Sequence, residues 1–290
     1  MTTLAIYHRT LYGYSSKVIE GVSEVRLSPM NCHHYGFDQR LYSFQLKTEP
    51  LGAIQQHQDA FGNIVHTLWF EEPHDQLIIE TRSIVERQMI NTESNLASLS
   101  ISKTISSVSQ EQWPEDYKQN FAEWLMETPS CLFLPEVQAL AQQFDLPAQG
   151  WPEVVRMARY LYENYSYQEK VTQVCSSVRE ILTKKMGVCQ DFSHLLLALL
   201  RYRAIPARYV SGYIPCDGIL RGGGASHAWV EVWLPGRDWQ GIDPTNNCLV
   251  NDHYVKIAHG RDYHDVVPVK GIFRGRAKQS MQVTVDVQIL

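Results

Sequence analysis

The sequence has no excess of positive charge, and this excludes one large class of partners. Its 290 residues carry 26 lysines and arginines against 31 aspartates and glutamates, a formal net charge of -5 at pH 7. Nucleic acids and acidic membranes are held by a basic field, so we expect no nucleic-acid or membrane partner. A peptide or another small amide-containing molecule is the expected partner, and the sequence leaves the oligomeric state open.

The sequence also lacks long apolar runs and closely spaced cysteines. No stretch reaches the roughly 20 apolar residues of a membrane-spanning helix. The N-terminus lacks the basic start and the apolar run of a secretory signal, so we expect a cytoplasmic protein. The six cysteines include no C-x-x-C pair and are too sparse for a disulfide scaffold, which predicts reduced thiols.

What is present is an ordinary globular composition, with 44% hydrophobic and 20% charged residues. The chain is longer than one typical domain of about 100 to 200 residues. We therefore expect two domains, an N-terminal one over residues 1–110 and a second one over residues 111–290.

The first domain has the period-two pattern of half-buried strands. Tyr42, Phe44 and Leu46 alternate with polar residues, and the turn-forming run 59–63 predicts a hairpin over 55–67. Short strands separated by turn signals at regular spacing are typical of a β-sandwich. No pair of nucleophile and base is evident in this half of the chain.

Histidines occur in both halves and raise a metal site as an alternative. Adjacent residues on a strand point to opposite faces, and none of the spacings repeats a zinc pattern. We interpret these histidines as surface or hairpin residues and expect neither a metal nor a cofactor. They are His33, His34, His57, His66 and His74 in the first half and His253, His259 and His264 in the second.

After residue 110 the apolar period changes to that of helices. Trp113-Pro114 and Trp151-Pro152 predict helix starts, because proline suits the first turn. The run 177–180 is a capping-box sequence, and Gly187 is expected to end that helix in the left-handed conformation. The next helix, from 189 to about 203, is apolar nearly all round and must be buried.

Strands follow these helices, over 207–213, 227–233 and 239–244. The last two are joined by Pro235-Gly236 and are expected to pair antiparallel. Helices first and strands afterwards indicate an α+β fold. Residues 281–289 alternate apolar and polar side chains, which predicts a C-terminal strand that completes a sheet.

Cys189 opens the buried helix, and this is a place where a cysteine becomes a nucleophile, because free N–H groups and the helix dipole favour a thiolate. His227 begins a strand after a glycine-rich loop and is expected to be the base, with Asp243 on the next strand as its orienter. Taken singly, a cysteine in the place of Cys189 is most often a small core residue, whereas His227 has the position of a common edge residue and Asp243 that of a common turn starter. Together they form a complete set for thiol acyl transfer.

Four blocks in this order resemble the transglutaminase-like superfamily, specifically its bacterial cysteine protease group: GVCQDF at 187–192, ARYVSGY at 207–213, HAWVEVW at 227–233 and WQGIDPTN at 239–246. The first half also resembles that group's N-terminal β domain, through RLSP at 26–29 and DAFGN at 59–63. The resemblance implies a papain-like catalytic core with an antiparallel sheet. It also implies Cys189 as nucleophile, His227 as base and acid, and Asp243 as orienter.

The resemblance favours a peptidase, isopeptidase or amidase that works through a thioester. Transglutaminase-type cross-linking or deamidation is an alternative, because water and an amine can resolve the same acyl-enzyme. The other alternative is a binding or assembly module that keeps the fold without turnover. We expect the backbone N–H of Cys189 to be one oxyanion donor, and Gln190 or Tyr167 to supply the second. Asp191, in the first helical turn, is interpreted as a helix cap.

Four further residues are candidates for the substrate cleft. Trp229 is either a core residue or an apolar wall of the cleft. Gly224 belongs to a glycine-rich loop without the Lys-Ser/Thr of a phosphate site, so we expect it to give flexibility beside the site. Arg261 and Asp262 stand in another block that resembles the bacterial group, and they either shape the cleft entrance or pair with each other.

Overall fold

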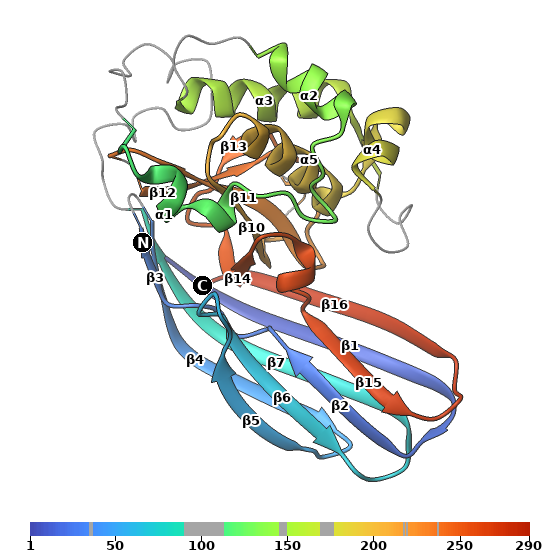
Figure 1. The fold of residues 1–290 in the computed structure, drawn as a ribbon. Helices are drawn as coiled ribbons and strands as arrows, with labels where there is room; N and C mark the ends of the chain where they lie inside the picture. Colours follow the sequence, from blue (N-terminus) through green and yellow to red (C-terminus); the bar gives the residue numbers. More distant parts are fainter. Residues whose placement is uncertain are drawn as a thin grey trace.

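The computed structural model describes residues 1–34, 37–89, 113–144, 150–168, 177–216, 218, 220–236 and 238–290. The chain forms two units (Figure 1). We call the lower one the β unit, because it consists of two antiparallel sheets, and the upper one the α+β unit, because helices cover a sheet there. Within the described ranges, no helix has the length and apolar character needed to cross a membrane.

The β unit contains strands from both ends of the chain. One sheet has the order β16-β1-β7-β4-β3 and the other the order β15-β2-β6-β5. The N-terminal strands are β1 (Thr2–Val18), β2 (Glu20–Val25), β3 (Cys32–His34), β4 (Phe37–Glu49), β5 (Ala53–Gln58), β6 (Ile64–Phe70) and β7 (His74–Gln88). The C-terminal strands are β15 (Val269–Arg274) and β16 (Gln279–Ile289).

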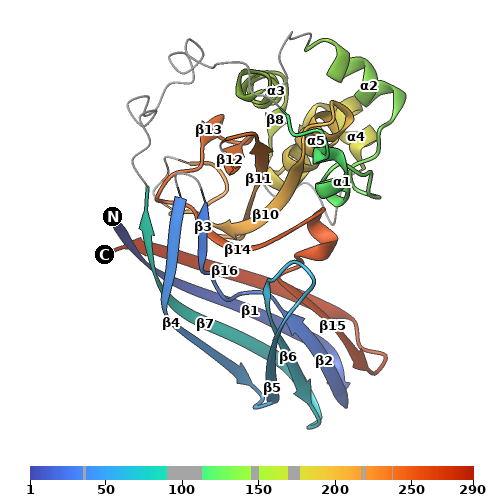
Figure 2. The same ribbon diagram turned by 60° about the vertical axis from the view of Figure 1, so that its left-hand side comes forward.

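The alternating residues 281–289 form β16 and complete a sheet, as expected. The sheet they complete is that of the β unit, because β16 pairs with β1 and β15 pairs with β2. The C-terminal strand therefore does not pair within the predicted second domain, and the two chain ends lie side by side (Figure 2). The boundary at residue 110 falls outside the described residues and stays a prediction.

The predicted hairpin is present as β5 and β6, which pair out to Gln58 and Ile64. Gly62 takes φ 77 in the turn, where a residue without a Cβ is favoured. Asp59 Oδ1 accepts the N–H groups of Phe61 and Asn63 and so stabilises the turn. An apolar cluster draws on both sheets: Tyr12, Val25, Leu27, Leu68, Phe70, Leu77 and Ile79.

The sheet of the α+β unit has the order β13-β12-β11-β10-β14, and its pairs are antiparallel. Its strands are β10 (Ala207–Tyr213), β11 (His227–Leu234), β12 (Asp238–Asp243), β13 (Cys248–Leu249) and β14 (Val255–Gly260). The helices are α1 (Tyr117–Asn120), α2 (Pro135–Gln142), α3 (Trp151–Asn164), α4 (Val178–Lys184) and α5 (Cys189–Tyr202), with 3₁₀ turns η3 (Ala122–Trp124) and η4 (Tyr263–Asp265). The predicted α+β class with antiparallel sheets is confirmed.

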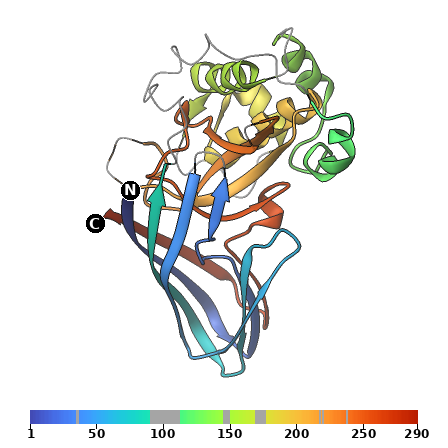
Figure 3. The ribbon, with the colours of Figure 1, turned by 90° about the vertical axis from the view of Figure 1, so that its left-hand side faces the viewer.

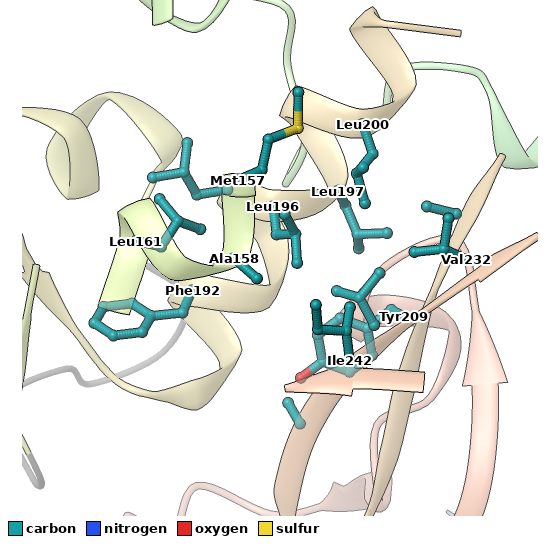
Figure 4. Packing of buried hydrophobic residues seen from close by; sticks show 14 of the residues in the cluster. Met157, Ala158, Leu161, Phe192, Leu196, Leu197, Leu200, Tyr209, Val232 and Ile242 are labelled. Carbon is teal, nitrogen blue, oxygen red and sulfur yellow. The ribbon is translucent and has the colours of Figure 1, made fainter. Parts of the chain in front are cut away.

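Helix α5 lies at the centre of this unit. Every residue from Asp191 to Arg201 is buried, and the helix packs against β10, β11, α2, α3 and α4. Figure 4 shows leucines of α5 between α3 and the sheet, with Met157, Ala158 and Leu161 on one side and Tyr209, Val232 and Ile242 on the other. The burial of α5 therefore fixes the position of its first residue, Cys189.

Two local predictions were wrong. Trp113 and Pro114 precede a short helix that begins only at Tyr117. Lys185, not Gly187, takes the left-handed conformation after α4, with φ 50. Gly187 instead lies in a short parallel pair, β8 (Ser166–Tyr167) with β9 (Met186–Gly187), just before α5.

The sheet of the α+β unit separates helices α2 to α5 from the β unit (Figures 2 and 3). Its edge strand β14 lies at the junction, where amide side chains of the β unit bond to its backbone. Gln39 Nε2 donates to Lys256 O at 2.7 Å, and Gln39 Oε1 accepts from Lys256 N at 2.9 Å. Asn63 forms the same pair of hydrogen bonds with the backbone of His259: Nδ2 donates to His259 O and Oδ1 accepts from His259 N, both at 2.8 Å.

Candidate active site

Cys189 is the first residue of α5, and the chain around it is shaped by Asp191. Asp191 Oδ2 accepts the backbone N–H of Val188 at 3.0 Å, so Asp191 caps the helix as expected. A Cβ added at Gly187 would lie 2.7 Å from the Asp191 side chain. A glycine is therefore needed where the chain turns into α5, because any larger residue would displace this cap.

His227 and Asp243 come together across the β11–β12 pair. His227 opens β11, Asp243 closes β12, and the register places Val230 opposite Ile242. Nε2 of His227 and Oδ2 of Asp243 are 2.7 Å apart, and both side chains are fully buried. The predicted base and its predicted orienter are thus hydrogen-bonded.

Asp243 is held by further donors. Its Oδ1 accepts the backbone N–H groups of Thr245 at 2.8 Å and of Asn246 at 3.3 Å. Its Oδ2 accepts Asn246 Nδ2 at 2.7 Å and Tyr254 Oη at 2.8 Å, in addition to His227. The sequence did not predict either of these two side chains as part of the site. The sequence does contain an indication for Asn246, because this residue ends the WQGIDPTN block, but it contains none for Tyr254.

The charges of this pair stabilise each other. Burial alone would lower the pKa of His227, but the charge of Asp243, followed by that of Cys189, outweighs it and raises the pKa to about 10. Burial alone would raise the pKa of Asp243, but His227 and the hydrogen bonds of Asn246 and Tyr254 bring it below its ordinary value. The pair is therefore best described as imidazolium and carboxylate.

Cys189 is the neighbour on the other side of the imidazole. It is half-buried, and its charge and a hydrogen bond contribute to the raised pKa of His227. Nδ1 of His227 is buried, and it is the ring nitrogen that does not bond Asp243. Thiol, imidazole and carboxylate thus stand in the order that thiol catalysis requires, with Nδ1 left for the sulfur.

The glycine-rich loop closes over His227. Gly222 has φ 91, and a Cβ there would lie 2.6 Å from Nδ1 of His227 and 3.2 Å from Oη of Tyr167. Gly222, which the sequence did not single out, is therefore the glycine in contact with the site. Gly224, which was predicted, has φ 82 and lies beside Cys216. Tyr167 stands next to the imidazole.

The other predicted site residues differ in their surroundings. Trp229 is 0% exposed and stacks on His227 at 6.5 Å between ring centroids, which is the core-packing role. Arg261 pairs with Asp265 at 2.9 Å rather than with Asp262. Asp262 accepts the N–H of His264 and so begins η4. Gln190 follows Cys189 on α5 and is half-buried.

The described residues contain no group of three or more His, Cys, Asp or Glu side chains arranged to hold a metal ion. Five of the six cysteines lie in the described part of the chain, and these five are free thiols: Cys32, Cys131, Cys189, Cys216 and Cys248. Cys175 lies outside it.

Two family models match this chain. One describes the transglutaminase-like superfamily and matches residues 138–244, and the other describes the bacterial transglutaminase-like N-terminal region and matches residues 4–86. An uncharacterised protein of Mycobacterium leprae is 31% identical over 295 residues, covering 99% of this chain and 99% of its own. A protein-glutamine gamma-glutamyltransferase of Pseudomonas aeruginosa is 31% identical over 124 residues, which is 38% of this chain and 18% of that protein.

Among solved structures, a protein of Cytophaga hutchinsonii that has been proposed to be a cysteine protease has a similar fold. The TM-score is 0.75 at 21% sequence identity, and the match covers 100% of this chain and 91% of that one. At this level of identity the likeness concerns the fold. It extends over both the β unit and the α+β unit.

Proposed function

The chain belongs to the transglutaminase-like superfamily and carries the bacterial N-terminal region of that family, and on this premise we propose that it is an enzyme of thiol-dependent acyl transfer at amide bonds. One observation carries the proposal: the buried His227–Asp243 pair stands beside Cys189 at the start of α5. Cys189 is the nucleophile, His227 the base and acid, and Asp243 orients His227.

The reaction has two halves. The Cys189 thiolate adds to the amide carbonyl carbon, the C–N bond breaks as His227 gives its proton to the leaving nitrogen, and a thioester remains. Water then adds to the thioester while His227 takes its proton. The C–S bond breaks, which releases the carboxylic acid and returns the Cys189 thiolate beside protonated His227. Asp243 stays anionic throughout and stabilises the imidazolium.

The tetrahedral intermediates carry an oxyanion that needs hydrogen-bond donors. The backbone N–H of Cys189 is the first, because the N–H groups of the first helical turn have no partner within the helix. We assign the second to Tyr167 rather than Gln190. The support for this choice is that the Tyr167 hydroxyl lies against Gly222, on the side of the loop that faces Nδ1 of His227.

Hydrolysis of a peptide or isopeptide bond is the outcome that we propose. It requires only that water reach the thioester, whereas transfer to an amine also requires a site that binds the amine in place of water. Amine transfer is the second candidate, and the similarity of 124 residues to a protein-glutamine gamma-glutamyltransferase favours it. A glutamine-donor peptide offered with a fluorescent primary amine separates the two, because only transfer labels the peptide.

The proposal is tested by comparing wild type with Cys189→Ala on a library of peptides and isopeptides. We expect wild type to cleave members of the library and the variant to lose this activity. Iodoacetamide labelling at pH 7, followed by mass spectrometry, measures the thiol itself. Cys189 should react about tenfold faster than exposed Cys216, because a thiolate rather than a thiol is alkylated.

Cys216→Ala is the matched control, since it removes an exposed thiol near the glycine-rich loop and should leave the cleavage rate unchanged. Full cleavage by Cys189→Ala would contradict the proposal. The binding-module alternative predicts that Cys189 is labelled no faster than Cys216 and that no library member is cleaved.

A further inference from the structure

Asp243 is fixed by the side chain of Tyr254, 11 residues further along the chain. Tyr254 Oη donates to Asp243 Oδ2 at 2.8 Å, on the same oxygen that accepts Nε2 of His227 at 2.7 Å. The Tyr254 ring is 0% exposed and packs edge-on against Trp229 at 5.3 Å between centroids. Burial and this packing restrict the position of the ring and therefore of its hydroxyl, which in turn bonds the carboxylate.

Tyr254 is itself held from the β unit by Arg87, near the end of β7. Arg87 Nε donates to Tyr254 O at 2.6 Å, and Nη2 donates to Asn251 O at 2.9 Å. The third nitrogen, Nη1, donates to Asp38 O at 3.0 Å, and the guanidinium lies 3.3 Å above the ring of Phe37. One planar group of the β unit thus fixes two carbonyls of the turn that carries Tyr254.

Space filling does not explain an arginine at this position. Arg87 is 0% exposed, and burying a charge is costly even when it is hydrogen-bonded. An apolar side chain would fill the same space without that cost. What the guanidinium adds is a rigid fork of donors that sets the spacing and direction of the carbonyls it bonds.

The β unit also contacts the opposite side of the site. Val285 N of β16 donates to Gly224 O at 3.2 Å. Gly224 lies two positions after Gly222, the residue in contact with His227. The β unit therefore contacts the loop beside the imidazole as well as the turn behind the carboxylate.

We propose that Tyr254 is a positioning residue for the His227–Asp243 pair and that Arg87 acts through it, which makes the β unit a working part of the active site. This inference rests on the proposed function. The route consists of consecutive hydrogen bonds from Arg87 to the backbone of Tyr254, from its hydroxyl to Asp243, and from Asp243 to His227.

Tyr254→Phe in the full chain tests the positioning role, because it removes the hydroxyl and keeps the ring. We expect kcat and the rate of Cys189 alkylation at pH 7 to fall about tenfold, as for a lost hydrogen bond to a charged group. KM should change less than about twofold, since the hydroxyl does not touch substrate. The midpoint of the alkylation pH profile should move to higher pH, because a loosely held Asp243 stabilises the imidazolium partner of the thiolate less.

Tyr213→Phe is the matched control. Tyr213 is also buried, and its hydroxyl bonds Nδ1 of His8 at 2.8 Å across the same junction between the units. The substitution therefore removes a comparable bond without touching Asp243. We expect wild-type kcat and a wild-type alkylation profile from this variant.

Arg87→Lys tests the route. Lysine keeps the charge but cannot bond two carbonyls with a planar fork, so the variant should lose kcat and shift the alkylation profile in the same direction as Tyr254→Phe. The double variant should lose little more than the larger single loss, because both changes act on one chain of contacts. If the fold-loss of kcat in the double variant equals the product of the two single losses, Arg87 and Tyr254 act independently, and the role given to Arg87 is overturned.

The remaining outcomes are distinct. Wild-type Cys189 that reacts no faster than Cys216 overturns the proposed function and this inference together. Reactive wild-type Cys189 with an unchanged profile in Tyr254→Phe overturns the inference alone. Equal losses in Tyr254→Phe and Tyr213→Phe would show a general effect of packing, which also overturns it.

Discussion

At the scale of single residues, the buried His227–Asp243 pair links the stability of the protein to pH. The pKa of His227 rises from 6.5 to about 10, because the charges of Asp243 and Cys189 outweigh burial. A group whose folded pKa is raised contributes stability that is complete below its unfolded pKa and is lost as the pH rises through its folded pKa. For His227 this window runs from about pH 6.5 to about pH 10.

We therefore predict that the free energy of unfolding of wild type falls between pH 6.5 and pH 10 relative to that of His227→Gln. The difference in the free energy of unfolding between wild type and His227→Gln should change by no more than about 1.4 kcal/mol per pH unit, which is the limit for one proton. Urea denaturation at a series of pH values measures it. The titratable groups that face the pair include Cys189, Tyr254, Cys248 and Tyr167, and all four remain in the variant.

Cys189→Ala provides the control for the thiol. Asp243 is the larger of the two charges that raise the pKa of His227, so this variant should keep much of the slope. If the difference in the free energy of unfolding between wild type and His227→Gln stays constant from about pH 6.5 to about pH 10, His227 is neutral in the folded protein.

At the scale of elements, the glycine-rich loop and the β11–β12 turn allow a matched test of contact with the site. Gly222 has φ +91, and an added Cβ would lie 2.6 Å from Nδ1 of His227. Gly236 has φ +72, and an added Cβ would meet nothing within 4 Å. Both positions disfavour L side chains through the backbone by about 1 kcal/mol. Only Gly222 adds a clash with the imidazole.

We predict that Gly222→Ala lowers the melting temperature more than Gly236→Ala does, and that only Gly222→Ala lowers kcat/KM, by about tenfold or more. Thermal unfolding and steady-state kinetics on a cleaved peptide measure the two effects. Equal activity in the two variants would mean that the loop does not press on His227.

The elements also show which parts of the site the sequence can predict. The hairpin at Gly62, the helix α5 and the order Cys189, His227, Asp243 have local patterns, so they could be read from residues close in the chain. No local pattern predicts the pair of hydrogen bonds between Gln39 and Lys256 or the contact of Arg87 with Tyr254. Their partners are 217 and 167 residues apart, so they exist only once the two units have assembled.

The lack of a local pattern also explains why the sequence did not predict Tyr254 as a site residue. It follows Asp243 by 11 residues, and no period or turn signal links the two positions. The pairing of β15 and β16 with the N-terminal sheets was missed for a related reason: alternation predicts a strand and a buried face, but it does not name the neighbouring strand.

At the scale of the whole molecule, the β unit completes the edge of the other sheet. β14 is an edge strand, and such strands leave N–H and C=O groups unpaired. Gln39 and Asn63 each bond one N–H and one C=O of this edge, at Lys256 and His259. Two amide side chains of the β unit thus act in place of a further strand, and the edge is buried.

This arrangement predicts a large effect of Asn63→Ala on the stability of the whole chain. Asn63 is 0% exposed, and its loss removes both hydrogen bonds that it makes to the buried backbone of His259. Each buried hydrogen bond that is lost costs about 1 to 3 kcal/mol, so the free energy of unfolding should fall by about 2 to 6 kcal/mol. Asn120→Ala, which removes an exposed amide bonded to Asp116, should change it by less than about 0.5 kcal/mol. Urea denaturation compares the two variants, and a loss below about 1 kcal/mol for Asn63→Ala would mean that water reaches this edge and that the hairpin does not seal the junction.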